Sequence, residues 1–258
     1  MNSLVAVDIG NSSIKLGWFP AGKTAADLPE SHVMTIDVQN LSSPEWDAFC
    51  MRVAPDAHWV IASVNQASCE AVSTAITQSS PRASLVQLDN SMLPMQILVD
   101  SPTAVGTDRL LAALAVTALY PTARPAIVID SGTAVTVDVV DRNGNFAGGV
   151  IMPGSNLIAR ALNTGTAQLP EIQLDKNQPP HPIGTNTTAA ISAGIFWGLI
   201  GSIKELVRQQ RIVLGESTPI FVSGGDGWLA QYLELDCQRV PHLCLKGIAA
   251  ALQIGLVE

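Results

Sequence analysis

The chain has 258 residues, of which 47% are hydrophobic and 14% are charged, with a formal net charge of -8 and a pI near 4.9. This length supplies enough apolar material for one large domain or two smaller ones, each with its own core. The acidic balance excludes broad binding to a phosphate backbone, because a negative surface repels nucleic acid. We therefore expect no nucleic-acid partner.

The sequence also gives no indication of export or of a membrane. The N-terminal segment has no positively charged start, and its apolar run ends at Asp8, unlike a secretory signal. The longest apolar stretch, residues 189–203, is shorter than the roughly 20 residues of a membrane-spanning helix, and Lys204 and Glu205 follow it. The four cysteines have no CxxC spacing, so neither a zinc site nor a disulfide framework is indicated. We expect a cytoplasmic protein without a membrane partner.

The first half alternates strand and helix patterns. Ser43 and Pro44 have the pattern of a helix cap followed by a first helical residue. Residues 107–120 predict another helix, which the segment 121–125 (PTARP) ends. Helices placed between strands indicate parallel pairing in a sheet. The predicted strands lie at residues 4–7, 14–19, 58–64 and 84–88.

The second half repeats the same order of elements. Asp8 and Asp130 mark corresponding points and stand about half a chain apart. We predict an internal duplication of an α/β unit, with domains at residues 1–118 and 119–258. The predicted elements of the second half are a strand pair within 126–140, a strand at 145–152, helices at 155–162 and 188–210, and a strand at 219–224.

Two stretches of the chain read nearly alike. Residues 4–18 are LVAVDIGNSSIKLGW, and residues 126–140 are AIVIDSGTAVTVDVV. In each, an apolar run ends in Asp, and Gly and small polar residues follow. Such a turn exposes backbone N–H groups that can hold phosphate oxygens, beside a carboxylate that can hold a hydrated divalent cation. One copy alone is more simply a polar hairpin turn, but two copies favour a pair of phosphate turns that face each other across a cleft.

The individual residues of these turns suit that chemistry. Gly10 permits close approach of a phosphate, and Lys15 can reach a terminal phosphate as a point charge. The corresponding candidates in the second turn are Gly132, Thr133 and Thr136.

Three further features each allow two interpretations, and a fourth stretch allows one. VSGGDG, residues 222–227, offers close backbone contact to a flat ring or ribose, which favours an adenosine site, or is a tight turn into a helix beginning near Trp228. GGVIMPG, residues 148–154, either lines the same cleft or is a strand end. The glycines at 194, 198 and 201 serve either packing within a domain or a subunit interface. Residues 174–188 read as a surface loop.

The stretch Gly106-Thr107-Asp108-Arg109 stands at the head of a predicted helix. In a purely structural interpretation, Thr107 caps the helix and Asp108 complements the positive end of its dipole. In the functional interpretation, Asp108 accepts the proton of an attacking hydroxyl during phosphoryl transfer, and Arg109 orients the substrate or neutralises phosphate charge.

Seven motifs, in this order, resemble those of type III pantothenate kinases, which belong to the actin-like, sugar kinase and acetate kinase superfamily. They are DIGNSSIK, PTAVGTDR, IDSGTAVTVD, GGVIMPG, GTAQLP, IGTNT and VSGGDG, and they span residues 4 to about 227. The resemblance implies an α/β fold of two duplicated ribonuclease H-like (actin-like ATPase) domains, with mixed sheets flanked by helices and an active site in the interdomain cleft. It also implies ATP-dependent phosphorylation of pantothenate to 4'-phosphopantothenate, the first step of coenzyme A biosynthesis.

The resemblance further implies a homodimer that uses ATP, Mg2+ and a monovalent cation, K+ or NH4+. Asp108 would be the catalytic proton acceptor, Asp8 would lie near the magnesium, and Asp130 would bind the monovalent cation. Holding hydrated magnesium remains an alternative role for Asp130. The implied ATP contacts are Asp8, Ile9, Gly10, Asn11, Ser12, Ser13, Ile14, Lys15 and Thr133. The implied pantothenate contacts are Gly106, Thr107, Asp108, Arg109 and Thr187.

Three positions depart from the family pattern. Thr107 stands where the family usually has Ala, Ala104 where it has an acidic residue, and Thr185 where it has a basic residue.

A non-catalytic regulatory member of the same family is the alternative function. A filament or chaperone ATPase would need insertions for which the chain has little room, and no GxGxxG follows the first strand as in dehydrogenases.

Overall fold

The computed structural model describes residues 3–10 and 13–254, which form two compact units. The first unit contains the described residues up to Thr122, residues 144–146 and the C-terminal segment from His242. The second unit contains residues 123–143 and 147–241. The expected domain ranges, 1–118 and 119–258, differ from these units because they assign the C-terminal helix to the second half.

The first unit is built on a mixed five-stranded sheet with the order β3-β2-β1-β4-β5. Strand β1 pairs antiparallel with β2 and parallel with β4. The predicted strands are confirmed, and β3 is an additional edge strand that was not predicted. The strands are β1 (Leu4–Ile9), β2 (Ile14–Phe19), β3 (Val33–Ile36), β4 (His58–Ser63) and β5 (Ser84–Gln87).

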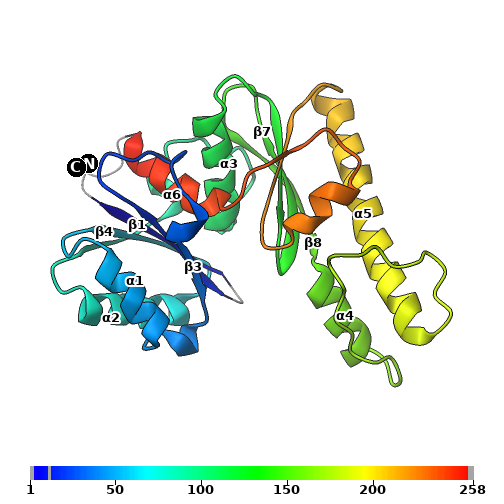
Figure 1. Cartoon of the computed structure of the whole chain (residues 1–258). Helices are drawn as coiled ribbons and strands as arrows, with labels where there is room; N and C mark the ends of the chain where they lie inside the picture. The colour runs from blue at the N-terminus through cyan, green and yellow to red at the C-terminus, as the bar shows by residue number, and fades with distance from the viewer. Residues whose placement is uncertain (1–2, 11–12, 255–258) are drawn as a thin grey trace. The chain divides into compact units, whose positions relative to one another are not determined.

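Two layers of helices cover this sheet. Figure 1 shows α1 (Pro44–Arg52) and α2 (Gln66–Ser79) on one face, and α3 (Thr107–Leu119) and α6 (Leu243–Gln253) on the other. The Ser43 hydroxyl caps α1 as predicted, accepting from the Trp46 N–H at 3.3 Å. Val5, Val7 and Ile9 belong to the core under α1 and α2. Because side chains alternate along a strand, Asp8 lies on the opposite face.

The C-terminal helix joins the first unit because it packs closely on α3. A Cβ at Gly247 would overlap the Leu111 carbonyl oxygen, so the two backbones approach as only glycine permits. Both helices are also rich in buried alanines, whose small side chains permit close packing. These are Ala112, Ala113 and Ala115 of α3 and Ala249, Ala250 and Ala251 of α6.

The second sheet has the order β10-β9-β6-β7-β8. Strand β6 pairs antiparallel with β7 and parallel with β9. Read from β8, this order matches that of the first sheet read from β3, which confirms the predicted duplication of a mixed-sheet unit. The strands are β6 (Ala126–Ser131), β7 (Ala134–Val140), β8 (Phe146–Pro153), β9 (Ile220–Ser223) and β10 (Gln238–Arg239).

Helix α5 (Thr187–Leu214) supplies much of the second core, with α4 (Ser155–Thr164) beside it. Phe196, Leu199 and Ile203 of α5 pack with Ile129 of β6 and Val222 of β9. Among the described residues, α5 is the one helix long and apolar enough to cross a membrane, and 44% of its most apolar window is buried. The buried residues of α5 pack as those of a core helix do, and the helix is longer than its apolar stretch.

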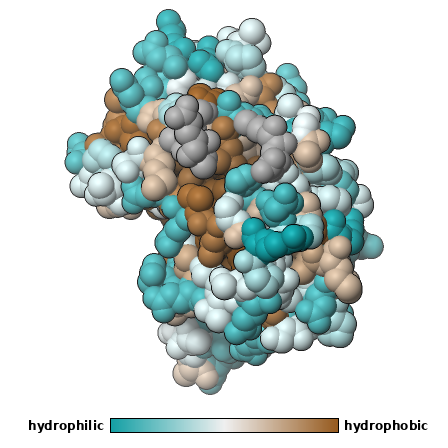
Figure 2. Space-filling view, turned by 90° about the vertical axis from the view of Figure 1, so that its left-hand side faces the viewer, coloured by the Kyte–Doolittle hydropathy of each residue, from teal (hydrophilic) through white to brown (hydrophobic). Residues whose placement is uncertain are grey.

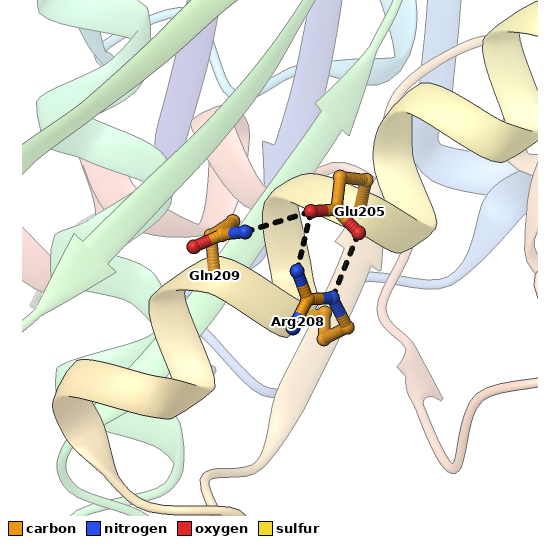
Figure 3. A network of polar contacts seen from close by, with 3 residues as sticks. All are labelled: Glu205, Arg208 and Gln209. Carbon is orange, nitrogen blue, oxygen red and sulfur yellow. Dashed lines mark hydrogen bonds and ion pairs between the residues drawn. The ribbon is translucent and has the colours of Figure 1, made fainter.

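The exposed C-terminal part of α5 carries a local polar network, drawn in Figure 3. Arg208 donates to both carboxylate oxygens of Glu205, at 2.7 and 2.8 Å, and Gln209 donates to the same group at 2.7 Å. These hydrogen bonds, first from Arg208 and then from Gln209, lower the pKa of Glu205 to about 2. The network therefore helps to keep this solvated part of the helix regular.

The glycines of α5 face open space. A Cβ at Gly194, Gly198 or Gly201 would have no neighbour within 4 Å among the residues that the structure describes. Packing within the unit therefore does not explain them, and the interpretation as a subunit interface stays a prediction. Short 3-10 helices complete the fold at Glu30–His32, Val38–Asn40, Asn90–Met92, Pro102–Ala104 and Gly227–Tyr232.

A cavity of about 310 Å³ lies in the first unit, between the sheet and the end of α6. Leu4, Phe19 and Leu252 contribute to its apolar lining, and His58 is among its polar residues. Figure 2, which shows the side that faces left in Figure 1, has apolar surface gathered in the middle of this face and polar residues around it. The cavity contains none of the predicted site residues in its lining, so it is separate from the candidate site.

Candidate functional site

Asp8 and Asp130 occupy equivalent positions in the two units. Each is the fifth residue of a six-residue first strand, β1 or β6. Across the antiparallel partner, Asp8 stands opposite Lys15, whereas Asp130 stands opposite Thr136. Across the parallel partner, Asp8 stands beside Ala62. Residues in register share a face of the sheet, so these partners are the side-chain neighbours of each Asp. The neighbours of Asp8 therefore differ from those of Asp130.

The first turn follows Asp8 directly. The Gly10 N–H donates to the Ser13 carbonyl oxygen at 3.1 Å, which closes the turn. Ile9 and Ile14 are buried in the core, so only their backbone groups could face a ligand. The predicted ATP contacts Asn11 and Ser12 lie outside the described residues.

The second turn is closed by the Gly132 N–H, which donates to the Ala134 carbonyl oxygen at 2.9 Å. The Gly154 N–H donates to the Thr133 carbonyl oxygen at 2.9 Å, and a Cβ at Gly154 would overlap the Gly132 carbonyl oxygen. The GGVIMPG stretch therefore packs directly on the turn that carries Thr133. The stretch is the end of β8 and, through Gly154, the N-cap of α4, as in one of its two interpretations. Whether it also lines a cleft stays a prediction.

The VSGGDG loop packs against the end of β6, the strand that carries Asp130. Gly224 has a φ of +96°, and a Cβ there would overlap the Ser131 carbonyl oxygen. The Asp226 N–H donates to that oxygen at 2.9 Å. Gly225, in contrast, has open space where a Cβ would stand. The loop thus presents an open backbone beside Asp130, although the helix expected from Trp228 is a short 3-10 helix.

Hydroxyl residues stand in register with Asp130 on both neighbouring strands. Ser223 of β9 stands in register beside it, opposite the side taken by Thr136. The Thr136 hydroxyl is buried and has no hydrogen-bond partner in the described part of the chain. A carboxylate with hydroxyl oxygens suits a hard cation. The residues that the structure describes contain no group of three or more His, Cys, Asp or Glu that could hold a metal ion, so any cation would need further ligands such as phosphate oxygens and water.

The Gly106 to Arg109 motif begins α3 in the first unit. The N-cap is Gly106, without a side-chain cap, so the expectation that Thr107 caps the helix is wrong. The Thr107 hydroxyl instead donates to the Asn90 side-chain oxygen at 2.7 Å, and the Asn90 amide donates to the Val105 carbonyl at 2.8 Å. Asn90 fixes the approach to the motif and was not predicted, because a lone Asn in a loop gives no sequence signal.

The side chain of Asp108 folds back over the start of α3. Its carboxylate accepts from the Arg109 N–H at 3.0 Å, and a Cβ at Gly106 would overlap it. The Arg109 guanidinium lies 5.3 Å from the ring centroid of Phe146, within cation–π range. A side chain at position 106 would therefore displace the Asp108 carboxylate from this position.

Thr187 begins α5, and its side chain is exposed. The Asn186 side chain caps the helix, accepting from the Ala189 N–H at 2.9 Å. A hollow of about 820 Å³ is lined by Thr185, Thr187 and Gly194 together with residues of α4. The IGTNT motif thus opens onto a surface large enough for a small molecule.

The predicted site residues therefore form two groups. The turn after Asp8 and the Gly106 to Arg109 motif lie in the first unit, whereas Asp130, Thr133 and Thr187 lie in the second. Within the second unit, the structure brings the DSGT, MPG and SGGDG segments into direct contact.

Each copy of the duplicated mixed sheet ends its first strand with an Asp-x-Gly sequence, Asp8 to Gly10 or Asp130 to Gly132, and we call the turns that follow the two Asp-Gly turns. This duplicated architecture defines the actin-like class of folds. A solved structure described as a conserved Baf family transcriptional activator from Campylobacter jejuni has this fold. The two are 19% identical and superpose with a TM-score of 0.59 over 97% of this chain and 98% of that one. At this identity the likeness shows the fold alone.

The family model for type III pantothenate kinase matches residues 4–209. A type III pantothenate kinase of Dehalococcoides mccartyi is 32% identical over 98% of both chains. One of Phenylobacterium zucineum is 42% identical over 141 residues, which are 55% of this chain and 53% of that protein. The chain also spans only about half the length of the similar relatives from Caulobacter vibrioides and Cereibacter sphaeroides in their alignments. The chain belongs to the type III pantothenate kinase family.

Proposed function

We propose that this protein transfers the γ-phosphoryl group of ATP to pantothenate, forming 4'-phosphopantothenate in the first step of coenzyme A biosynthesis. The observation that carries the proposal is the equivalence of Asp8 and Asp130 on duplicated strands, in a chain of this family that also has Asp108 at the head of α3. Both Asp-Gly turns contact the same ATP in this proposal.

Each group has a role in transfer. The backbone N–H groups of the turn after Asp8 bind phosphate oxygens, and Lys15 adds a positive charge where negative charge collects. Asp8 would help to hold Mg2+, which would neutralise phosphate charge. Asp108 accepts the proton of the attacking pantothenate hydroxyl late in a loose transition state.

The surroundings of Asp130 support a monovalent cation site. Thr136 and Ser223 flank it in register, and the Thr136 hydroxyl has no partner in the described chain. We assign to Asp130 and these oxygens a K+ or NH4+ ion, with hydrated magnesium as the alternative. Thr133, on the adjoining turn, contacts ATP.

Pantothenate is bound by the Gly106 to Arg109 motif and by Thr187, in a cytoplasmic homodimer. Ala104 and Thr185 stand where the family usually has charged side chains, so this pocket is less charged than the family pattern. The exposed glycine face of α5 supports the homodimer, because a Cβ at Gly194, Gly198 or Gly201 would meet no atom within 4 Å among the described residues, which leaves this face open to a second copy.

The deciding experiment is a coupled assay with pantothenate, ATP, Mg2+ and K+, run on the wild type and on Asp108→Asn. We expect turnover by the wild type and a loss of about 10² or more in kcat for the variant, because the proton acceptor is lost. ATP affinity, measured by calorimetry, should change little. Unchanged turnover would remove Asp108 from the mechanism.

A non-catalytic regulatory role is the alternative. Its support is the printed description of the Campylobacter jejuni protein, at 19% identity. All three carboxylates proposed for catalysis are present in this chain, so the alternative is not favoured. Absence of turnover by the wild type under the same conditions would favour it.

A further inference from the structure

A buried carboxylate in the VSGGDG loop is paired with a lysine from a distant segment. The side chain of Asp226 is only 6% exposed, and it forms an ion pair with Lys176, which lies between α4 and α5. The Ser155 hydroxyl donates to the second carboxylate oxygen at 3.2 Å. Both oxygens of Asp226 are therefore satisfied by side chains from outside the loop.

The segment that carries Lys176 is fixed in place. We call residues 175–181 the strap. The Tyr232 hydroxyl donates to the Asn177 carbonyl oxygen at 3.3 Å, and the Trp197 indole N–H donates to the Pro180 carbonyl oxygen at 3.0 Å. The expected surface loop is thus anchored on α5 and on the 3-10 helix after the VSGGDG loop, which holds the ammonium group at Asp226.

The position of Asp226 relates this ion pair to the candidate nucleotide site. Its N–H donates to the Ser131 carbonyl oxygen, one residue beyond Asp130, and Gly224 packs on the same oxygen. A buried carboxylate without a partner is costly, and the loop would have to move to hydrate it. An unpaired negative charge here would also repel the phosphates of a nucleotide.

We propose that Lys176 is a positioning residue for nucleotide binding. Through Asp226, it keeps the backbone of residues 223–227 in the conformation that receives the nucleotide, and it neutralises the charge of Asp226, whose N–H binds Ser131 of the second turn. This role rests on the proposed function, together with the expectation that the VSGGDG loop forms the adenosine site of ATP.

The chain offers a closely matched control. The side chains of Lys176 and Lys204 are 38% and 39% exposed, and each pairs with one carboxylate. The partner of Lys204 is Glu234, whose side chain is 79% exposed, whereas the side chain of Asp226 is 6% exposed. The two lysines therefore differ in the burial of the partner, and an exposed pair contributes little.

The test measures ATP binding by calorimetry without pantothenate, and then KM for each substrate. For Lys176→Met we expect ATP affinity to fall about tenfold or more, because one partner of a buried pair is lost. KM for pantothenate should stay within about twofold, and Lys204→Met and Lys176→Arg should bind ATP about as tightly as the wild type. The double variant Lys176→Met with Asp226→Asn should regain most of the lost affinity, because no unpaired carboxylate remains.

Three results would overturn this role: Lys176→Met binding ATP like the wild type, an equal rise in both KM values accompanied by a lower Tm, or a double variant as weak as the single one. A wild type that binds no ATP would instead overturn the proposed function, and this role with it.

Discussion

The two Asp-Gly turns share one topology and differ in what surrounds the carboxylate. In the first unit, Asp8 has Lys15 across the antiparallel pair and Ala62 across the parallel pair. In the second unit, Asp130 has hydroxyl residues, Thr136 and Ser223, at both positions. In the proposed function, the first arrangement would place a positive charge near phosphate, and the second would offer oxygen ligands to a cation.

The turns also differ in how they are supported. The second turn has the backbone of two glycine segments packed against it, through Gly154 and Gly224. At the first turn, a Cβ on Gly10 would meet only the Ser13 carbonyl oxygen, at an ordinary 3.4 Å, among the described residues. Duplication therefore preserved the strand order, while register neighbours and supporting loops made the two copies chemically different.

The largest effect is expected where the second turn is most crowded. Gly224→Ala should lower the free energy of unfolding by about 3 kcal/mol or more, because φ is positive and the new Cβ overlaps the Ser131 carbonyl oxygen. Gly225→Ala is the matched control, since open space surrounds that position. Denaturant unfolding measures both, and equal stability of the two variants would contradict the described packing.

Lys15→Met tests the charge that distinguishes the first turn. We expect kcat/KM to fall about 10²-fold, because the charge opposite Asp8 no longer stabilises the transferring phosphoryl group. Lys23→Met, an exposed lysine of the same unit, should leave the rate unchanged. A Lys15→Met enzyme as active as the control would remove this difference between the turns.

Asp130→Asn tests the oxygen-rich second turn. The K+ concentration for half-maximal activity should rise about tenfold or more, with a smaller change in the Mg2+ requirement. Titrations of each cation against initial rate measure this. The opposite pattern, a raised Mg2+ requirement alone, would assign Asp130 to hydrated magnesium and make the two turns alike.

The smallest effect is expected outside both turns, at Glu205 on the exposed part of α5. The pKa of Glu205 is lowered to about 2 by hydrogen bonds from Arg208 and Gln209. A lowered folded-state pKa contributes stability above the ordinary pKa of Glu, and this contribution is lost as the pH falls toward about 2. Thermal unfolding of Glu205→Gln at neutral pH should match the wild type within about 1 °C, and any difference should shrink in acid. A difference that grows in acid would contradict this assignment.

The sequence predicted those parts of the fold that have strong local patterns. The strands bearing Asp8 and Asp130 combine apolar runs with a turn, and the Ser43 cap marks α1. Strand β3 and helix α2 were missed: β3 is a short edge strand, and α2, which begins after Asn65, is rich in Ser, Thr and Ala with few large apolar residues. Their structure depends on packing against the sheet rather than on local propensity.

The contacts that complete the site depend on tertiary structure. Asn90 reaches Thr107 from 17 positions away, and Lys176 reaches Asp226 from 50 positions away. No local pattern encodes such pairs. The prediction that Thr107 caps α3 is wrong for the same reason: its hydroxyl donates to Asn90, a residue distant in sequence.

The central claim is that both Asp-Gly turns serve one nucleotide. A crystal structure of the protein with Mg2+ and a non-hydrolysable ATP analogue tests it most directly. The account predicts one nucleotide whose phosphates lie within hydrogen-bond reach of the backbone of the turn after Asp8 and of the turn that contains Gly132 and Thr133. A nucleotide that contacts only one of these turns would contradict it.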